Sequence, residues 1–434
     1  MDKVVQQTSA ERPDSTPSAA AAVLRDAARR GRTGVWFVGA RGSVATTALV
    51  GALAIRGGLT GALGCVVEQP EIAVAPLPGF GELVFGGHDV VDVTYAKRAE
   101  LLAGQDVLPG QLLDPLAGAL AAADEQVRPV VAPDPAADPG SAQRALVASL
   151  RADLEDFVAR HGLARLVVVD LSSTHAPVEV THEDLRTPES VQRAWEQGRA
   201  PLPDSAVHPW AAFEAGAGFV AFTPSPGIDL PSVSELGRRL GATWAGADGK
   251  TGETLLKSVL APMFVERSLR VDSWASVNLL GGGDGSTLAD PVAARSKTTT
   301  KAAGLEALLG RTVPGPMHID YVPDLGDWKT AWDHVRFSGF LGTQMTLQFT
   351  WQGCDSALAA PLVLDLARLM SACMAAGETG AVSELGFFFK NPLGSHEHAL
   401  SVQWQELARL AGRLAERAQP TGTAPPPTAT AAQL

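Results

Sequence analysis

The sequence predicts an α/β fold built on a doubly wound parallel sheet, and three observations support this prediction. Short runs that are wholly or largely apolar, at residues 35–38, 166–171 and 219–222, are typical of strands that are buried on both faces. An amphipathic segment of helical period, residues 141–160, lies between two of these runs and stops before Gly162. A glycine-containing turn follows the first run directly, as in many parallel βα units.

The remaining elements are predicted in order along the chain. After the first strand, a helix is expected from Thr46 to the pair Gly57-Gly58, and residues 65–67 are expected to form the second strand. The proline-rich segment 128–140 is expected to be a loop. After Trp244 the sequence changes to clustered glycine, aspartate, lysine and serine, which indicates a second α/β unit that carries chemistry. Two further helices are expected at residues 360–370 and 402–417.

Composition excludes several classes of function. The chain has 434 residues, of which 46% are apolar and 19% charged, so it is not a disordered chain. Its formal net charge of −12 argues against nucleic-acid binding, which needs a basic face. Three cysteines are too few for a disulfide framework or a zinc site, and no apolar run approaches the length of a membrane span. We therefore expect a soluble, cytoplasmic protein with no membrane or nucleic-acid partner.

A glycine-rich loop follows the first strand. Its residues are Gly39, Ala40, Arg41, Gly42, Ser43, Val44 and Ala45. Glycines allow a sharp turn and a close approach of the backbone to a pyrophosphate, and the helix that begins here offers unpaired N–H groups. Arg41 stands where the usual dinucleotide fingerprint has its middle glycine, so the loop by itself fits either a cofactor site or a plain tight turn. Glu68, at the end of the expected second strand, fits either a ribose ligand or a solvated strand end.

A second glycine-lined loop, residues 246–254, contains the tripeptide Gly-Lys-Thr. A P-loop for a nucleoside triphosphate would need glycine at the position of Trp244, so a P-loop is rejected. Lys250 and the nearby threonine hydroxyls suit a single phosphate monoester instead.

Four lysines stand in unusual surroundings. Lys297 and Lys301 are four residues apart on one face of an expected helix, and Lys329 follows Gly-Asp-Trp. Lys390 follows three phenylalanines, which suggests a buried strand that delivers an amine into an apolar pocket. Such amines can transfer protons and stabilise oxyanions, and the alternative is that each is a solvated surface lysine.

Three aspartates accompany these lysines, namely Asp248, Asp284 in a glycine-rich turn and Asp355 in an otherwise apolar segment. A carboxylate in apolar surroundings needs a partner, so we expect Asp355 to pair with one of the lysines. His396 and His398 are two residues apart and share no helix face, so the sequence does not favour a metal site there.

Together these motifs resemble the inositol-3-phosphate synthase family, also called myo-inositol-1-phosphate synthase, and its short archaeal and bacterial form in particular. The likeness extends from about Gly34 to Leu407, and residues 245–301 carry its most specific part. The matching segments are VGARGSVATT (38–47), FGGHD (85–89), LSST (171–174), FTPSPG (222–227), AGADGKTGETLLKSVLAPMF (245–264), VNLLGGGDG (277–285), SKTTTK (296–301), GDWKTAWD (326–333), AAPLVLDLARL (359–369) and FFKNPLG (388–394).

The resemblance implies a modified Rossmann NAD-binding domain, residues 33–244 plus 360–418, with an inserted second α/β catalytic and oligomerisation domain at 245–359. Flexible tails are expected at 1–32 and 419–434. The resemblance also implies a homotetramer that uses NAD to convert the sugar phosphate D-glucose 6-phosphate to 1L-myo-inositol 1-phosphate, by oxidation at C5, enolisation at C6, aldol closure onto C1 and re-reduction. The sequence leaves open whether a divalent or monovalent cation lies near the phosphate.

The resemblance further assigns residues to roles. The catalytic residues it implies are Lys297, Lys301, Lys329, Lys390, Asp248 and Asp355. The cofactor-binding residues are those of the loop from Gly39 to Ala45 together with Ser173, Thr174 and Asp284, and the substrate-binding residues are Lys250, Asn278 and Ser296. Lys329 is expected to transfer the proton at the C5 oxygen, and Lys297 and Lys390 to act in the enolate and aldol steps.

The sequence departs from the family at two places. His175 stands where the family usually has glutamate, and Ser43-Val44 replace two asparagines of longer members. The complete lysine set argues against a catalytically silent NAD-binding homologue. The sequence does not separate glucose 6-phosphate cyclisation from a related synthase that forms a five-membered carbocycle from a ketohexose phosphate such as fructose 6-phosphate.

Overall fold

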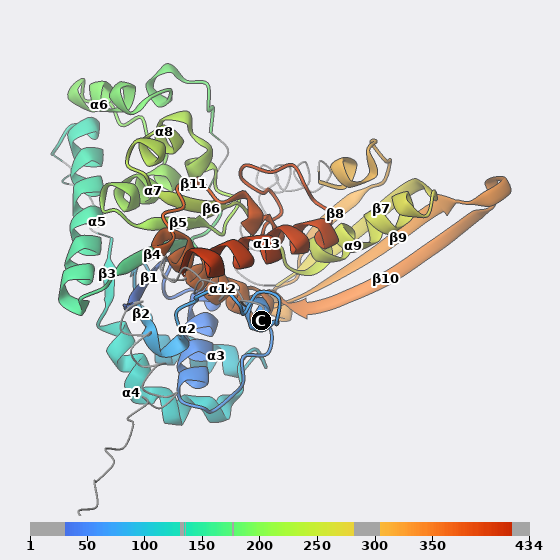
Figure 1. Cartoon of the computed structure of the whole chain (residues 1–434), viewed down its shortest axis with the longest axis horizontal. Coiled ribbons are helices and arrows are strands. Elements are labelled where there is room, and N and C mark those ends of the chain that lie inside the picture. Colours follow the sequence, from blue (N-terminus) through green and yellow to red (C-terminus); the bar gives the residue numbers. More distant parts are fainter. Residues whose placement is uncertain (1–30, 131–133, 135, 176–177, 282–303, 419–434) are drawn as a thin grey trace, which may run out of the picture.

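The computed structural model describes residues 31–130, 134, 136–175, 178–281 and 304–418 (Figure 1). These residues form two sheets. One is a seven-stranded sheet with helices on both faces, and the other is a four-stranded sheet that extends away from it.

The seven-stranded sheet has the strand order β11-β6-β5-β4-β1-β2-β3, and all its pairings are parallel. Its strands are β1 (Thr33–Val38), β2 (Leu83–Asp89), β3 (Val127–Pro129), β4 (Arg165–Asp170), β5 (Gly218–Ala221), β6 (Thr243–Gly246) and β11 (Gly380–Ala381). The chain order reverses between β1 and β4, which is the arrangement of a doubly wound dinucleotide-binding sheet. The predicted α/β class is thereby confirmed.

Two helical layers cover this sheet (Figure 1). One layer contains α2 (Ser43–Arg56), α3 (Tyr95–Ala103), α4 (Leu113–Asp124), α12 (Asp355–Ala375) and α13 (Leu400–Ala418). The other contains α5 (Pro139–His161), α6 (Pro188–Glu196), α7 (Asp204–Glu214) and α8 (Pro231–Arg239).

The strand β1 shows why the buried strands have continuous apolar runs. Val35 and Phe37 pack into one helical layer, whereas Trp36 and Val38 pack into the other. Because successive side chains of a strand point to opposite faces, a strand between two cores must be apolar at every position.

Helix ends follow local chemistry. The α5 helix begins at Pro139, after the Asp138 carboxylate accepts the Ser141 N–H at 3.0 Å, and it ends where Gly162 adopts a φ of +59°. The helices predicted at 141–160, 360–370 and 402–417 are present as α5, α12 and α13. Each is longer at both ends than the apolar pattern indicated.

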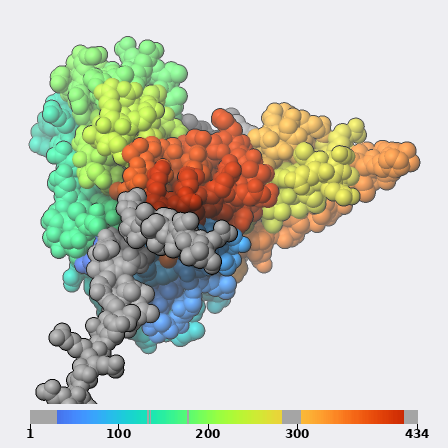
Figure 2. Space-filling view, in the orientation of Figure 1, coloured from blue at the N-terminus to red at the C-terminus, as the bar shows by residue number. Residues whose placement is uncertain are grey.

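The four-stranded sheet has the order β10-β9-β7-β8. Its strands are β7 (Arg270–Leu280), β8 (Met317–Tyr321), β9 (Trp328–Ser338) and β10 (Gln344–Cys354). The helix α9 (Gly252–Glu266) packs on one face, where Phe264 meets Trp274 and Val335. The β9–β10 hairpin projects from the body of the molecule (Figures 1 and 2).

Short 3-10 helices complete the described secondary structure. They are Val66–Glu68, Phe80–Glu82, Gly110–Leu112, Glu183–Leu185, Pro226–Asp229, Pro323–Leu325, Phe340–Gly342 and Ser383–Phe388.

The helix α12 is long and apolar enough to cross a bilayer by length and composition alone, the one such helix in the described ranges. However, 72% of its apolar window is buried within the fold, where it packs into the same core as α2. Its composition is that of a core helix. All three cysteines, Cys65, Cys354 and Cys373, are buried and unpaired.

The prediction of a second strand at residues 65–67 is wrong. Val66–Glu68 form a 3-10 helix that α12 holds in place, since the Val66 N–H donates to Asp365 at 2.5 Å and Arg368 pairs with Glu68 at 2.6 Å. Glu68 therefore ends no strand, and the strand beside β1 is β2. The apolar pattern of β2 is interrupted by glycines. Glycine is required at position 87, because a Cβ on Gly87 would lie 2.4 Å from the Phe37 carbonyl oxygen.

The buried carboxyl of Asp365 makes a pH-dependent contribution to stability. Burial raises the pKa of Asp365 to about 7. A carboxyl with a higher pKa in the folded than in the unfolded state contributes stability at acidic pH, and this contribution is lost as the pH rises through the folded pKa. We expect Asp365→Asn, which stays neutral, to gain stability relative to the unchanged protein as the pH rises from about 4 to about 8. Urea unfolding across this range measures the difference, and a constant difference would contradict the prediction.

Candidate active site

A cavity of about 300 Å³ opens at the carboxyl ends of β1, β4 and β5, facing the second sheet. Doubly wound sheets bind ligands at the point where the strand order reverses, which here lies between β1 and β4. The first sheet contributes one wall, and α9, the second sheet and the beginning of α12 contribute the other. The cavity therefore lies between the two parts of the fold.

The glycine-rich loop forms part of the first wall. Gly39 has a φ of +80°, and a Cβ there would lie 3.0 Å from the Leu171 carbonyl oxygen, so glycine is required. The N–H groups of Gly39 and Ala40 donate to the His88 carbonyl at 2.9 and 3.1 Å. The later residues of the loop, Gly42, Ser43, Val44 and Ala45, line the cavity.

These features fit a dinucleotide. The helix α2 begins at Ser43, so its first backbone N–H groups and the positive end of its dipole face the cavity, where a pyrophosphate would find donors. The Arg41 side chain, which stands in place of the usual middle glycine, lies 3.4 Å from Asp92 and 3.5 Å from Asp124 and does not line the cavity.

Asp89, and not Glu68, stands at the end of the strand beside β1, the position considered for a ribose ligand. It ends β2, and an acidic residue at this strand end binds the ribose hydroxyls in many doubly wound domains. Its carboxylate also accepts the Arg41 N–H at 2.6 Å and the Val91 N–H at 2.8 Å, which ties it to the glycine-rich loop. The sequence signal for Asp89 is its place as the last residue of the segment FGGHD. This signal points to a ribose ligand only once β2 is known to be a strand, and the apolar pattern does not predict β2.

A polar network shapes the end of β4. The buried Asp170 carboxyl accepts the Ser172 N–H at 3.0 Å and the Ser172 hydroxyl at 2.6 Å, and burial raises the pKa of Asp170. Ser173 and Thr174, two of the predicted cofactor-binding residues, follow and line the cavity. The N–H of His175, where the sequence departs from the family, donates to the Ser225 hydroxyl at 3.2 Å.

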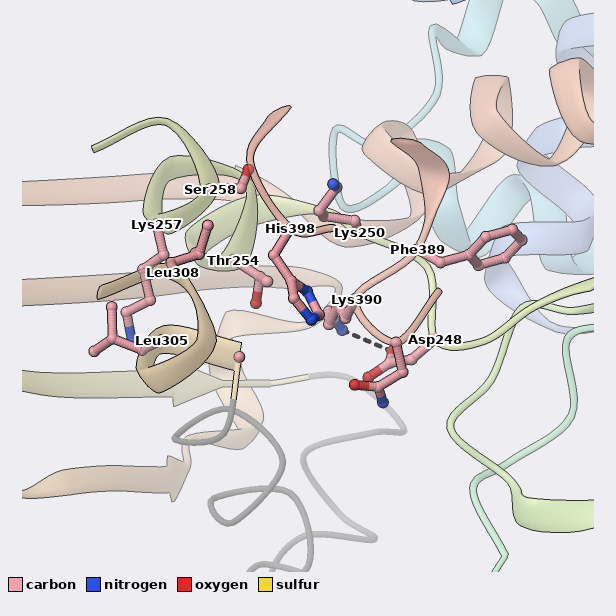
Figure 3. A pocket seen from close by; sticks show the side chains of 12 residues that line it. Asp248, Lys250, Thr254, Lys257, Ser258, Leu305, Leu308, Phe389, Lys390 and His398 are labelled. Atoms are coloured by element: carbon pink, nitrogen blue, oxygen red, sulfur yellow. Dashed lines mark hydrogen bonds and ion pairs between the residues drawn. The ribbon is translucent and has the colours of Figure 1, made fainter. Parts of the chain in front are cut away.

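An antiparallel ladder brings Asp248 and Lys390 together. The Lys390 N–H donates to the Asp248 carbonyl at 2.7 Å, and the two side chains form an ion pair at 2.7 Å (Figure 3). The strand expected before Lys390 is instead the 3-10 helix Ser383–Phe388, and Phe389 alone is extended and bridges to Gly249. Phe388 and Phe389 are fully buried, so they hold Lys390 at the cavity wall as core side chains.

A second pair joins Lys329 and Asp355. Lys329 lies near the start of β9 and Asp355 is the first residue of α12, and their side chains form an ion pair. The Thr251 hydroxyl donates to the same carboxylate at 2.9 Å. Burial acts to raise the pKa of Asp355, but the charges of Lys329 and Lys390, together with the hydrogen bonds from Lys329 and Thr251, outweigh burial and the pKa is lowered. Asp355 therefore remains a carboxylate that holds the lysine.

Lys250 does not line this cavity. Its side chain lies in a separate, smaller cavity beside His398, and its ammonium donates to Gln403 of α13. Burial lowers the pKa of Lys250 to about 7. Asn278, another predicted substrate ligand, is buried on β7 and lines the main cavity. The predicted residues Asp284, Ser296, Lys297 and Lys301 lie outside the described residues.

Besides Asp89, three further charged residues at the site, Asp327, Glu253 and Lys257, were not singled out from the sequence. Asp327 lines the cavity and accepts the Ser356 hydroxyl, and Glu253 lines it from α9 and forms an ion pair with Lys257. The spacing of Glu253 and Lys257, four residues apart in the most family-specific segment, was the available signal. Across the described ranges, no group of three or more His, Cys, Asp and Glu side chains could hold a metal ion.

The arrangement favours chemistry on a carbonyl compound. Two lysines, each held by an aspartate, line the cavity together with the glycine-rich loop. Ammonium groups in a cavity of this kind stabilise negative charge on oxygen and move protons to and from it.

Comparison with known proteins gives concordant results. The family model described as myo-inositol-1-phosphate synthase matches residues 33–411. Inositol-3-phosphate synthase 1 of Bacteroides thetaiotaomicron is 31% identical over 414 residues, which cover 86% of this chain and 94% of that protein. The crystal structure of inositol-3-phosphate synthase from Caenorhabditis elegans has a TM-score of 0.75 at 22% identity and covers 89% of this chain and 86% of that one.

A myo-inositol-1-phosphate synthase-related protein from Thermotoga maritima has a TM-score of 0.67 at 22% identity, covering 88% of this chain and 98% of that one. The two solved structures share the fold described above. Because the family model matches most of the chain and the bacterial relative is similar across nearly its whole length, the protein belongs to the myo-inositol-1-phosphate synthase family.

Proposed function

We propose that the protein uses NAD catalytically to cyclise D-glucose 6-phosphate to 1L-myo-inositol 1-phosphate. The observation that carries the proposal is the pairing of Lys329 with Asp355 and of Lys390 with Asp248 in the cavity that the glycine-rich loop also lines. The family of the chain and the name of its bacterial relative support the same reaction.

Bound NAD would supply the acceptor for the substrate hydride and would be regenerated within the cycle. Gly42 to Ala45 would hold its pyrophosphate, with Ser173 and Thr174 beside it and Asp89 at the ribose. Asp284 remains a proposed cofactor contact from the sequence resemblance. Gly39, Ala40 and Arg41 act as the turn that shapes this site.

The lysines handle the proton and oxyanion chemistry. Lys329, as the neutral amine, takes the proton from the C5 hydroxyl as C5 is oxidised, forms the ammonium that pairs with Asp355, and returns the proton on re-reduction. A carbonyl at C5 acidifies the C6–H bond, so the phosphate oxygen of the substrate or a base removes that proton and an enolate forms. Its C6 carbon attacks the C1 aldehyde to close the ring, and the alkoxide left at C1 takes up a proton. Lys390 and Lys297 stabilise the enolate and the alkoxide that results, and Lys301 adds positive charge.

The remaining site residues position these groups. Asp355 and Asp248 hold Lys329 and Lys390, and Asn278 and Ser296 bind the substrate. For Lys250 we retain a supporting substrate-binding role, because its buried amine lies beside the ladder that carries Lys390. A cation near the phosphate, divalent or monovalent, would reduce the repulsion between the phosphate and these carboxylates.

The test is incubation with NAD+ and a panel of hexose phosphates, with products identified by NMR. We expect an inositol phosphate from glucose 6-phosphate and no net reduced nicotinamide by absorbance during steady turnover, because the hydride returns to the same molecule. Stoichiometric accumulation of reduced cofactor would instead identify a simple dehydrogenase. A five-membered carbocycle from fructose 6-phosphate would overturn the assigned substrate.

The proposal includes a homotetramer and a division of the chain into an NAD-binding unit and an inserted catalytic unit at 245–359. In the second sheet, Trp332 is 39% exposed, and Phe340 and Leu341 at the hairpin tip are each 87% exposed. Apolar side chains gathered on a projecting sheet suit contact with further copies of the chain. The three unpaired cysteines support a reducing, cytoplasmic location.

A further inference from the structure

A buried ionic cluster lies behind the wall of the main cavity and has no part in the reaction described above. Glu253, in the first turn of α9, is 2% exposed and lines the cavity. One turn later, Lys257 forms an ion pair with it. The Lys257 ammonium also donates to the Ser276 hydroxyl at 3.1 Å and lies 3.8 Å from the carboxylate of Asp333.

The cluster is fixed from the side of the second sheet. The Asp333 carboxylate accepts the Ser276 hydroxyl at 2.6 Å and the Trp274 indole N–H at 2.7 Å, and Asp333 is fully buried. The Lys257 ammonium lies 5.7 Å from the centre of the Trp274 ring. The lysine that holds Glu253 is thus itself held on several sides, so the Glu253 carboxylate has a defined position.

Burying charged groups costs desolvation free energy, so this cluster is an unfavourable way to hold α9 against the sheet. Two carboxylates and one ammonium are buried together, and burial followed by the charge of Glu253 raises the pKa of Asp333. Apolar side chains of similar size commonly stabilise a fold at least as well as a buried ion pair. The neighbouring contacts of α9, through Ala261 and Phe264, are of that apolar kind. The charged cluster occurs instead where α9 borders the cavity.

The two kinds of charge in the cavity suit different parts of a sugar phosphate. Lys329 and Lys390 attract groups that carry negative charge. An ionised carboxylate is an acceptor with no hydrogen to donate, so it selects donors, and in a hexose phosphate the donors are the hydroxyl groups. A carboxylate can accept two hydroxyl hydrogens at once, and hydrogen bonds to an ionised group are the stronger ones.

We propose that Glu253 is a specificity-determining residue whose carboxylate accepts hydrogen bonds from hydroxyl groups on the non-reacting carbons of the sugar, with Lys257 orienting it. This inference rests on the proposed function for the identity of the substrate. Under that function C1, C5 and C6 react, so the hydroxyls available for recognition are those on C2, C3 and C4.

The experiment compares glucose 6-phosphate with its 2-deoxy, 3-deoxy and 4-deoxy analogues. Because a buried acceptor that loses its donor is left unpaired, we expect the unchanged enzyme to lose on the order of 100-fold in kcat/KM for at least one analogue. Glu253→Gln should lose about 10–100-fold with glucose 6-phosphate. With the analogue that lacks the partner hydroxyl, the same variant should differ from the unchanged enzyme by less than about threefold.

The control is Glu266→Gln, which makes the same change at the exposed far end of α9. It should leave all four substrates unaffected. Glu253→Gln retains the size of the side chain, and Asp333 still faces Lys257, so thermal unfolding should show a folded protein. An equal loss with all four sugars, or an unchanged enzyme that accepts all three analogues equally, would overturn the inference.

Binding separates failure of this inference from failure of the proposed function. The affinities of the four sugars for the protein loaded with reduced NAD, measured by calorimetry, require no turnover. If the enzyme cyclises no hexose phosphate, the proposed function fails, and the pattern of affinities between Glu253→Gln and the unchanged protein still decides the role of Glu253. Identical affinity patterns in the two proteins would overturn it.

Discussion

Replacing Lys329 by alanine is expected to lower kcat by a factor on the order of 10²–10³, the loss typical of removing one group that stabilises an oxyanion. Under the proposed mechanism, the lysine would meet the substrate at the oxygen whose charge changes most, so its interaction would be made mainly in the transition state. Asp355 keeps its hydrogen bond from Thr251 and its place in the first turn of α12, so the variant should fold. Steady-state kinetics on the purified variant measure the effect.

Affinity for NAD+ should be retained in Lys329→Ala, because the residues that fit the cofactor come from the first sheet. Lys329→Arg should not restore activity. A guanidinium does not release its proton near neutral pH, and the space is tight, since a Cβ at Gly252 would already lie 2.9 Å from the Lys329 ammonium.

Lys97→Ala is the matched control. Lys97 is 62% exposed and pairs only with Glu100 on the surface, so its removal should leave kcat unchanged. Activity of Lys329→Ala within a few-fold of the unchanged enzyme would defeat the role assigned to Lys329 and with it the proposed mechanism.

Gly42→Val is expected to abolish detectable NAD+ binding in a protein that remains folded. Gly42 has a φ of −72°, which valine can adopt. A Cβ there would lie 3.2 Å from the Gly39 carbonyl oxygen, a tight contact that requires a shift of a few tenths of an ångström in the turn. Gly42 lines the cavity at the beginning of α2, and in the proposed cofactor site a pyrophosphate would approach the backbone closely there. A valine side chain would fill that space and cover the N–H groups of the helix.

The measurement is titration of the protein with NAD+ by calorimetry, and circular dichroism establishes that the variant is folded. Gly51→Val is the matched control in the same helix, since a Cβ there meets nothing within 4 Å. We expect its affinity for NAD+ to be unchanged. Equal affinities of the two variants would rule out the glycine-rich loop as the pyrophosphate site.

Much of the fold could be predicted from local sequence. The run at residues 35–38, the glycine turn after it and the helix that follows were predicted correctly, because each depends on burial and backbone chemistry within a few residues. The strand β2 was missed for the opposite reason. Gly87 is needed because the Phe37 carbonyl of the neighbouring strand lies close, and Gly86 because the rings of Trp36 and Phe157 do, and no local pattern records these approaches.

For the candidate site, too, local sequence predicted one part and packing decided the other. The residue types at Asp248, Lys329, Asp355 and Lys390 indicate carbonyl chemistry from the sequence alone, and the resemblance names the family that the comparisons confirm. The prediction that Asp355 pairs with one of the lysines is confirmed by its ion pair with Lys329. The choice of partner could not be predicted, since Lys390, for example, meets a carboxylate 142 positions away. Which carboxylate holds which amine depends on how two distant chain segments form a ladder.

The sequence by itself determined the α/β class, the family and the chemical types of the site residues, because buried apolar runs, glycine turns and a complete lysine set are properties of short segments. The tertiary structure alone decided where side chains point. It turned Lys250 toward α13, placed Asp89 at the strand end considered for Glu68, and brought Glu253 to the cavity wall. Direction and pairing arise from packing between segments far apart in the chain, and burial then sets the charge that each group carries.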